Sequence, residues 1–330
     1  MTDSLSLEGR VALITGAGRG MGRTHAHLLA ERGARIVVND LGGASNGDGQ
    51  SDAPAKRVAD EINQLGGRAI ADGHDASTPD GTAAMVESAI AHFGRLDILV
   101  HNAGVVSFVP LSEMTYEQYR KLVSVHQDGA FLLCKAAWPH FLKRKFGRVI
   151  LITSLASIPG LTHYAAAKAA LSGFARCLAL EGEPHDIRVN AVSVVAYTRL
   201  MAAFFDPRSG HADLGLYGQQ AIEDWWRENL RPEQVSQVVG WLADEQCPIS
   251  GETLFAGGGQ VSLQFVGLTE GSTDTHFTPE TLHDHREQIL STERYVRVKP
   301  ADGLSWLFSR LVANGVPPLP PIRPSTGDSR

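Results

Sequence analysis

The sequence predicts an α/β fold built on a doubly wound parallel sheet, and three observations support that prediction. Short apolar runs alternate with longer segments of helical periodicity from the N-terminus to about residue 260. The first apolar run leads directly into a glycine-rich turn that opens a helix. Strands separated by helices pair in parallel, and the helices then cover both faces of the sheet.

The apolar runs expected to be buried strands are residues 11–15, 34–39, 69–71, 96–100, 149–153, 189–192 and 253–255. The helices expected between them are residues 21–32, 54–65, 82–93, 116–143 and 164–181. Pro139 is expected to bend or shorten the fourth of these helices. Residues 42–53 are rich in Gly, Ser, Asn and Asp, which predicts a surface loop after the second strand.

The chain beyond the last strand is expected to be an appendage. In this interpretation residues 1–260 form the main domain, and residues 261–330 form a C-terminal extension. Within the extension, Thr278 is expected to cap a helix whose first residue is Pro279. The proline-rich residues 317–321 are expected to be extended and loosely packed.

The composition argues against a nucleic-acid-binding or membrane-spanning protein. The chain is 43% hydrophobic and 20% charged, and its net charge of −6 does not suit an unaided nucleic-acid surface. No stretch reaches the ~18 apolar residues of a membrane span, and the polar N-terminus lacks a signal core. Cys134, Cys177 and Cys247 are widely spaced, so we expect buried thiols in a reducing, cytoplasmic setting.

The 13 histidines do not show the spacing of metal ligands. His25 and His27, like His283 and His285, are two residues apart and would point in different directions from a helix. No HExxH pattern occurs. The sequence therefore predicts no metal site.

The glycine-rich turn after the first strand predicts a dinucleotide site. Gly16, Gly20 and Gly22 allow a tight turn and a close approach of the backbone to a diphosphate. The helix that follows presents free N–H groups and the positive end of its dipole. This strand–turn–helix unit is the signature of a Rossmann fold.

Asp40, at the end of the second strand, favours NAD over NADP. Its carboxylate can accept both hydroxyls of the adenine ribose and would repel a 2′-phosphate. Arg19 lies in the glycine turn and can attract a phosphate, which is the opposing influence. Asp40 has a second interpretation, as a cap for the glycine loop that follows it.

Tyr164 and Lys168 form a candidate acid/base pair. They are four residues apart in a predicted helix, so both side chains lie on one face. A phenol with a reference pKa of about 10 is a poor base at neutral pH. An ammonium group beside it stabilises the phenolate and lowers that pKa, which suits proton transfer to or from an alcohol.

These features together resemble the short-chain dehydrogenase/reductase family over residues 7 to about 260. The glycines match TGxxxGxG, Tyr164 and Lys168 match YxxxK, and residues 102–104 match NAG, with His101 where a first Asn is usual. The resemblance implies further cofactor contacts from Met21, Gly22, Leu41, Asp75, Ala76, Asn102, Ala103 and Gly104. Asp75 is expected to end the third strand, near the adenine.

Within this family the chain resembles the dehydrogenase part of the type 2 multifunctional enzymes. The matching stretches are residues 38–43, 125–126, 129–131, 136–140 and 254–257. Thr278-Pro279-Glu280 also looks like their post-core extension, so this similarity reaches about residue 290. Their hydratase and sterol-carrier parts are absent from this sequence.

The resemblance implies that Tyr164 is the acid/base and that Lys168 lowers its pKa and holds the nicotinamide ribose. A serine after the fifth strand binds the reacting oxygen in the family, and Ser154 holds that position. The family has twelve residues between this Ser and the Tyr, whereas this chain has nine. Counting back from Tyr164 by the family's spacing reaches Leu151, which has no hydroxyl group. A three-residue deletion within residues 155–163 explains the difference and keeps Ser154 in the role. Ser157 is the alternative serine.

His126 stands where the family has an Asn on its fourth helix. An imidazole can donate and accept, so it can hold a water chain that relays protons to Lys168, or it can simply pack between helices. In the family a Pro-Gly pair follows the sixth strand, and Val194-Val195 occupies that place here. The loop of residues 193–201 normally lies along the nicotinamide, so Thr198 is a candidate cofactor residue.

The expected function is NAD-dependent interconversion of a secondary alcohol and a ketone. Residues 199–230 are expected to form a lid whose apolar pocket suits a bulky substrate, and its aromatic residues are Phe204, Phe205, Tyr217, Trp225 and Trp226. A hydroxysteroid is favoured over a (3R)-3-hydroxyacyl-CoA, because the lid has only Arg199, Arg208 and Arg227 to meet CoA phosphates. An NAD-binding protein with little turnover is a further alternative. The family also implies a homodimer or homotetramer formed through residues 116–143 and 164–181.

Overall fold

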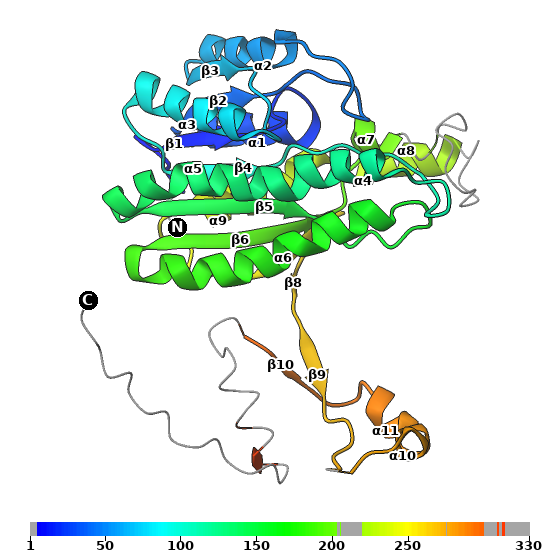
Figure 1. Cartoon of the computed structure of the whole chain (residues 1–330). Coiled ribbons are helices and arrows are strands. Elements are labelled where there is room, and N and C mark those ends of the chain that lie inside the picture. The colour runs from blue at the N-terminus through cyan, green and yellow to red at the C-terminus, as the bar shows by residue number, and fades with distance from the viewer. Residues whose placement is uncertain are drawn as a thin grey trace, which may run out of the picture. The chain divides into compact units, whose positions relative to one another are not determined.

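The computed structural model describes residues 5–202, 205, 220–274, 276–299, 309 and 312–313. The chain divides into two compact units, Met1–Gln264 and Phe265–Arg330. The first unit holds an eight-stranded sheet between two layers of helices (Figure 1). The predicted doubly wound α/β fold is confirmed.

Seven parallel strands and one antiparallel edge strand make up the sheet, in the order β3-β2-β1-β4-β5-β6-β7-β8. The parallel strands are nearly continuous apolar runs because they are buried between helices on both faces. The strands are β1 (Val11–Ile14), β2 (Arg35–Asn39), β3 (Arg68–Asp72), β4 (Ile98–His101), β5 (Gly147–Thr153), β6 (Ile187–Val194), β7 (Thr253–Gly257) and β8 (Gln260–Gln264).

The helices form two layers, each with its own apolar core. One core lies beneath α1, α2 and α9, and the other lies beneath α3, α5 and α6. The helices of this unit are α1 (Gly20–Glu31), α2 (Ala53–Gln64), α3 (Pro79–Phe93), α4 (Tyr116–Val123), α5 (Gly129–Arg144), α6 (Thr162–Gly182), α7 (Arg199–Ala202), α8 (Gln220–Asn229) and α9 (Pro232–Ala243). A 3-10 turn, Glu183–His185, follows α6.

The strand order reverses between β1 and β4, and this reversal positions the site. β1 pairs with β2 on one side and with β4 on the other, so the connections that leave β1 and β4 run to opposite faces of the sheet. A crevice opens at the carboxyl ends of two such strands. The glycine turn follows β1 and the Asn102-Ala103-Gly104 turn follows β4, so both border this crevice.

The single helix predicted over residues 116–143 is interrupted. A π-helical turn, Ser124–Asp128, separates α4 from α5 and contains the buried residue His126. A π turn accommodates one extra residue within a continuous helix, and apolar periodicity does not reveal it. Pro139 does not shorten α5, which continues to Arg144.

Three smaller expectations are corrected. Asp72, not Asp75, ends the third strand, because the ladder with β2 stops at the Asn39–Asp72 pair. Cys177 is exposed on α6, whereas Cys134 and Cys247 are buried as expected. The chain after the glycines at 257–259 turns back as the unpredicted strand β8.

The second unit contains a small antiparallel pair and two short helices. Its elements are β9 (Gly267–Thr269), α10 (Pro279–Asp284), α11 (Arg286–Leu290) and β10 (Tyr295–Arg297). Thr278 caps α10, with Pro279 as its first residue, as the sequence predicted. The proline-rich residues 317–321 lie outside the described residues.

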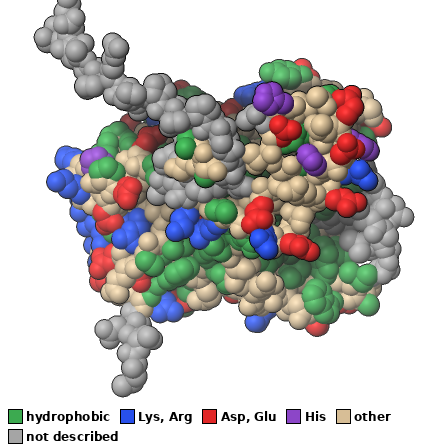
Figure 2. Space-filling view, turned by 90° about the horizontal axis from the view of Figure 1, so that it is seen from below, with side chains coloured by type: hydrophobic (Ala, Val, Ile, Leu, Met, Phe, Trp, Pro, Cys, Tyr) green, Lys and Arg blue, Asp and Glu red, His purple; other side chains and the backbone are tan. Residues whose placement is uncertain are grey.

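Hydrophobic side chains are also present on the surface. Figure 2 shows them gathered in a band on one face of the molecule, with charged groups around it. On the outer sides of α5 and α6, the exposed apolar residues include Phe131, Leu142 and Leu180.

Candidate active site

The glycine turn after β1 is held to the end of β4 by hydrogen bonds. Asn102 Nδ2 donates to the carbonyls of Thr15 (3.0 Å) and Gly16 (3.1 Å). Thr15 Oγ1 in turn accepts the backbone N–H groups of Asn102 and Ala103. Gly16 adopts a φ of +63°, and a Cβ there would lie 2.9 Å from Ala103 Cα. The turn therefore requires glycine for both its conformation and its packing.

Gly22 supports the turn from behind. A Cβ on Gly22 would lie 2.2 Å from the Gly16 carbonyl oxygen and 2.6 Å from Asn102 Nδ2. Gly22 is buried and does not line the cavity described below, although the sequence placed it among the cofactor contacts. Its role in the structure is to let α1 approach the turn.

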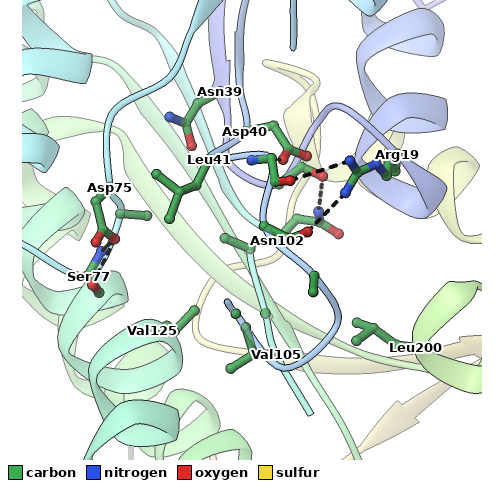
Figure 3. Close-up of a pocket in the computed structure, with 18 of the residues that line it drawn as sticks. Arg19, Asn39, Asp40, Leu41, Asp75, Ser77, Asn102, Val105, Val125 and Leu200 are labelled. Carbon is green, nitrogen blue, oxygen red and sulfur yellow. Dashed lines mark hydrogen bonds between the residues drawn. The ribbon is translucent and has the colours of Figure 1, made fainter. Parts of the chain in front are cut away.

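Asp40 connects the glycine turn to the loop after β2. Asp40 Oδ2 accepts the backbone N–H of Gly18 at 2.9 Å, and Oδ1 accepts that of Gly42 at 2.7 Å. The capping interpretation of Asp40 is therefore confirmed, and Asp40 also lines the cavity described below. Arg19 donates to the carbonyls of Gly43 (3.0 Å) and Gly42 (3.4 Å), as Figure 3 shows.

A cavity of about 250 Å³ occupies the crevice at the ends of β1, β2 and β4. The sequence-predicted cofactor residues that line it are Gly16, Arg19, Gly20, Met21, Asp40, Leu41, Asp75, Ala76, Asn102, Ala103, Gly104 and Thr198. The bare glycine turn, the open start of α1 and the carboxylate at the end of β2 are the groups that a dinucleotide requires. The residues present therefore fit such a cofactor.

The loop after β2 covers part of this cavity, which the sequence did not predict. Residues 42–50, expected to be only a surface loop, are closed at their base by the Ser51 N–H donating to the Leu41 carbonyl at 2.9 Å. The loop tip is held where the Val106 N–H donates to the Ser45 carbonyl and where Lys121 Nζ meets Asp48 Oδ1 at 2.5 Å. The sequence feature that could have predicted this cover is the high number of glycines after β2, because glycine lets the backbone of a loop pack closely against other segments.

Asp75 lines the cavity from the loop between β3 and α3. Asp75 Oδ1 accepts both the backbone N–H and the hydroxyl of Ser77 (2.8 and 2.7 Å). These bonds close the turn that precedes Thr78, the N-cap of α3. The carboxylate is thus oriented by its own turn, and Asp75 lines the cavity (Figure 3).

Ser154 lies directly after β5, and its side chain is close enough to Tyr164 to act on the phenol and lower its pKa. Ser154 Oγ also accepts the Ala156 N–H at 3.1 Å, which fixes its direction. Ser157 is exposed, and its hydroxyl donates to the Leu155 carbonyl at 3.5 Å. The structure therefore brings Ser154, not Ser157, to Tyr164, and the shorter loop leaves the strand in register.

Lys168 lies one turn after Tyr164 on α6 and is buried. Its Nζ donates to the Ile152 carbonyl at 2.7 Å and lies 5.8 Å from the centre of the Tyr164 ring. Burial lowers the pKa of Lys168 to about 7. Burial raises the pKa of Tyr164, and the Ser154 hydrogen bond only partly opposes this. The sequence led us to expect a lowered tyrosine pKa, whereas burial is the larger influence and keeps that pKa above its ordinary value.

His126 packs edge-on against Tyr164, with ring centres 5.3 Å apart. Its Nε2 lies 2.8 Å from the Val105 carbonyl oxygen and 3.2 Å from the Val105 backbone nitrogen, so it can donate to the first or accept from the second, depending on the tautomer. Its Nδ1 has no hydrogen-bond partner among the described residues. Burial, and next the Lys168 charge, hold the pKa of His126 well below its usual value, so the ring is neutral.

Tyr164 also belongs to an apolar cluster built on Val106, Leu161 and Phe205. It joins the loop after β4, residues 155–161 and the segment after β6. Its members are Val106, Phe108, Ala156, Ile158, Leu161, Tyr164, Tyr197, Leu200, Met201, Phe205, Ile222 and Trp226. Of the lid aromatics named from sequence, Phe205 and Trp226 pack edge to face at 5.2 Å. Trp225 is exposed, and Phe204 and Tyr217 lie outside the described residues.

In the part of the chain that the structure describes, no three His, Cys, Asp or Glu side chains come together so as to hold a metal ion. None of the helices in that part has both the length and the hydropathy to cross a membrane.

Comparison with known proteins agrees with this geometry. The family model of the short chain dehydrogenases matches residues 10–206. A putative short-chain type dehydrogenase/reductase of Mycobacterium tuberculosis is 37% identical over 258 residues, which is 77% of this chain and 84% of that protein.

A second relative is the peroxisomal multifunctional enzyme type 2 of Drosophila melanogaster, 37% identical over 77% of this chain and 40% of its own length. Its full-length structure aligns with a TM-score of 0.72 and 25% identity, covering 94% of this chain and 50% of that one. The chain thus spans about half or less of that enzyme.

A third is a 7α-hydroxysteroid dehydrogenase complexed with NADH and 7-oxo glycochenodeoxycholic acid. It aligns with a TM-score of 0.67 and 29% identity, covering 78% of this chain and 97% of that one. The chain belongs to the short-chain dehydrogenase family, whose members are oxidoreductases that use NAD(P).

Proposed function

We propose that this protein interconverts a secondary alcohol and a ketone on a bulky apolar substrate, with NAD as the cofactor. One observation carries the proposal. Tyr164, on which Ser154 acts, belongs both to the apolar cluster around Phe205 and to the cluster of Val105, a residue of the cavity wall. An apolar substrate and a cofactor therefore have adjoining places on either side of one phenol.

The chemistry assigned to the chain is proton transfer and orientation. Tyr164 takes the hydroxyl proton of the alcohol, and Ser154 donates a hydrogen bond to the same oxygen. Lys168, whose ammonium is one helical turn away, favours the phenolate when it is protonated. The bound NAD supplies the hydride acceptor at the nicotinamide.

His126 is assigned a positioning role. Its Nε2 holds Val105 and its ring supports Tyr164, so it sets the distance between the cavity wall and the phenol. The free Nδ1 is available to form a hydrogen bond with a water molecule on the path to Lys168.

NAD is preferred over NADP because of how Asp40 is held. Two backbone N–H groups point its carboxylate into the crevice, where it can accept ribose hydroxyls and repel a 2′-phosphate. Arg19 is engaged by the Gly42 and Gly43 carbonyls, so it does not neutralise this repulsion directly.

A hydroxysteroid is the favoured substrate class. The wall near Tyr164 is apolar, and of the three lid arginines Arg227 is paired with Glu223 and Asp224 on α8. Arg199 points to the cofactor cavity, and Arg208 lies outside the described residues. A rigid apolar ring system therefore suits this wall better than a ligand that carries several phosphates.

A (3R)-3-hydroxyacyl-CoA is the second candidate. The similarity to multifunctional enzymes, one of which is a hydratase-dehydrogenase-epimerase 36% identical over 88% of this chain, favours it. Compounds of both substrate classes are therefore included in the test.

The test is NADH formation with a panel of hydroxysteroids and 3-hydroxyacyl-CoAs of matched concentration, with Tyr164→Phe as control. We expect turnover with a hydroxysteroid, at least a hundredfold loss in Tyr164→Phe, and NADH binding that is unchanged because the ring is retained. Turnover with acyl-CoAs alone would replace the first candidate by the second. Tight NADH binding without turnover on either class would favour a binding protein, the third alternative.

A further inference from the structure

A buried histidine lies directly before the proposed acid/base. His163 is the second residue of α6, next to Tyr164 in the chain, and only 1% of its surface is exposed. Its Nε2 lies 3.0 Å from the hydroxyl oxygen of Ser107, in the loop after β4. Its Nδ1 has no hydrogen-bond partner among the described residues. The contact with Ser107 therefore fixes the direction of this ring.

This polar pair lies in apolar surroundings. The residues near His163 and Ser107 in the chain that belong to the apolar cluster described above are Val106, Phe108, Leu161 and Tyr164. A hydrogen bond in such surroundings is electrostatically stronger than one in water. Removing one partner would leave the other buried without a hydrogen bond, which is costly. The bond between His163 and Ser107 therefore holds two segments together more firmly than a bond at the surface would.

A second bond joins the same two segments. The Val109 N–H donates to the Gly160 carbonyl at 3.0 Å. The two bonds together tie the loop after β4 to the segment that connects Ser154 with Tyr164. Because only nine residues lie between Ser154 and Tyr164, an anchor in that segment constrains both side chains.

A second histidine holds the same loop from another element. His126 Nε2, in the π turn, lies 2.8 Å from the carbonyl oxygen of Val105 and 3.2 Å from its nitrogen. Val105 and Ser107 are thus each held by one histidine. Tyr164 packs against the first of these rings and is next in the chain to the second, so the loop and the phenol are fixed relative to each other.

We propose that His163 and Ser107 are positioning residues for Tyr164. Their bond holds the first turn of α6 against the loop after β4, and this keeps the phenol in place beside Ser154 for proton transfer. The proposal rests on the function proposed above and adds two residues that act through Tyr164. A serine beside a histidine also occurs in nucleophilic catalysis, but there a third group orients the imidazole, and none bonds Nδ1 of His163 in the described part of the chain.

The test combines steady-state kinetics, calorimetric titration with NADH and hydrogen–deuterium exchange, all on the full chain. The kinetics use the compound of the hydroxysteroid and 3-hydroxyacyl-CoA panel that the wild type oxidises fastest. The variants are Ser107→Ala, His163→Leu, the double variant and His163→Gln, which keeps a hydrogen-bonding group toward Ser107. The matched control is Ser236→Ala, which removes another buried Ser–His bond, 2.7 Å to His25 Nδ1, between α1 and α9.

We expect Ser107→Ala and His163→Leu each to lower kcat by about ten- to a hundredfold, the effect of a small displacement of a reacting group. The double variant should lose no more than the larger single loss, because both substitutions break one bond. His163→Gln should recover most of the lost kcat. NADH affinity should be unchanged, since His126 still holds Val105 at the cofactor cavity. The Val109 N–H should exchange faster in Ser107→Ala and His163→Leu.

The control separates a positioning role from a structural one. Ser236→Ala should be less stable than the wild type in urea and should keep its kcat. A loss of kcat in Ser236→Ala as large as in Ser107→Ala would overturn the proposal, because any buried Ser–His bond would then have this effect.

The remaining outcomes distinguish this proposal from the proposed function. Wild-type kcat in both Ser107→Ala and His163→Leu would overturn the positioning role and leave the function intact. Losses that multiply in the double variant would show that the two residues act separately, which also overturns it. No turnover by the wild type would overturn the proposed function. In that case faster exchange of the Val109 N–H in the variants would still support the role of the pair in holding the loop, and unchanged exchange would overturn it.

Discussion

Gly104 lies directly against the imidazole ring of His126. A Cβ on Gly104 would be 2.6 Å from Cε1 and 3.4 Å from Nδ1. The ring cannot retreat, because it is buried and its Nε2 is bonded to Val105. The glycine of the Asn102-Ala103-Gly104 turn is therefore matched to a histidine in the π turn 22 residues later, and Gly104 itself lines the cavity.

Gly104→Ala should lower the free energy of unfolding by about 1–3 kcal/mol, because the methyl group overlaps a ring that has no room to move. Urea denaturation measures this. In a His126→Ala background the ring is gone, so the same Gly104→Ala change should cost less than about 0.5 kcal/mol. An equal cost in both backgrounds would show that His126 is not the neighbour that makes glycine necessary.

Ser154→Ala should reduce kcat by roughly a hundredfold or more, since it removes the hydrogen bond to the reacting oxygen and to Tyr164. Ser157→Ala is the matched control and should retain wild-type activity, because its hydroxyl is exposed and reaches only the Leu155 carbonyl. Steady-state kinetics on both variants decides between them. Full activity in Ser154→Ala with loss in Ser157→Ala would reverse the assignment.

Asp40→Asn should raise the ratio of kcat/KM for NADP to that for NAD, because the repulsion of a 2′-phosphate disappears while an oxygen remains to accept the Gly42 N–H. Asp40→Ala should weaken NAD further, since Gly18 and Gly42 both lose their acceptor. Initial rates with the two cofactors measure these ratios. A wild type that already uses NADP as well as NAD would contradict the ribose argument.

The buried Lys168 should make stability depend on pH. Its pKa of about 7 in the folded protein lies below the ~10.4 of an unfolded lysine. Between these values the unfolded chain binds a proton that the folded chain does not, so stability rises with pH in this window.

Relative to Lys168→Met, the wild type should therefore gain up to about 1.4 kcal/mol per pH unit between pH 7 and pH 10. Urea denaturation across that range tests this, with Lys56→Met on the exposed side of α2 as control for the loss of a lysine. A flat difference between wild type and Lys168→Met would show that the folded protein keeps this lysine protonated.

Self-association should occur through the outer sides of α5 and α6, where Phe131 and Leu180 are exposed. Burial of such side chains supplies the free energy of association. Sedimentation velocity should show a dimer or tetramer that Phe131→Glu weakens. Leu65→Glu, an equally apolar exposed site beside α2, should leave the assembly unchanged. A monomer at micromolar concentration in the wild type would defeat this prediction.

The sequence by itself determined the elements that depend on local spacing. Alternation of apolar runs with helical segments predicted the sheet. The glycine turn after the first strand predicted at which edge of the sheet a dinucleotide would bind. The four-residue step from Tyr164 to Lys168 was enough to put both on one face of α6. These features follow from backbone geometry within a few residues, so no distant contact can alter them much.

Only the tertiary structure decided what depends on residues far apart in the chain. It selected Ser154 over Ser157, inserted the π turn at His126 and folded residues 42–50 over the cavity. It also showed that burial raises the pKa of Tyr164 in this state. Each of these outcomes is set by packing and desolvation between segments that meet only after folding, and local periodicity contains no record of those contacts.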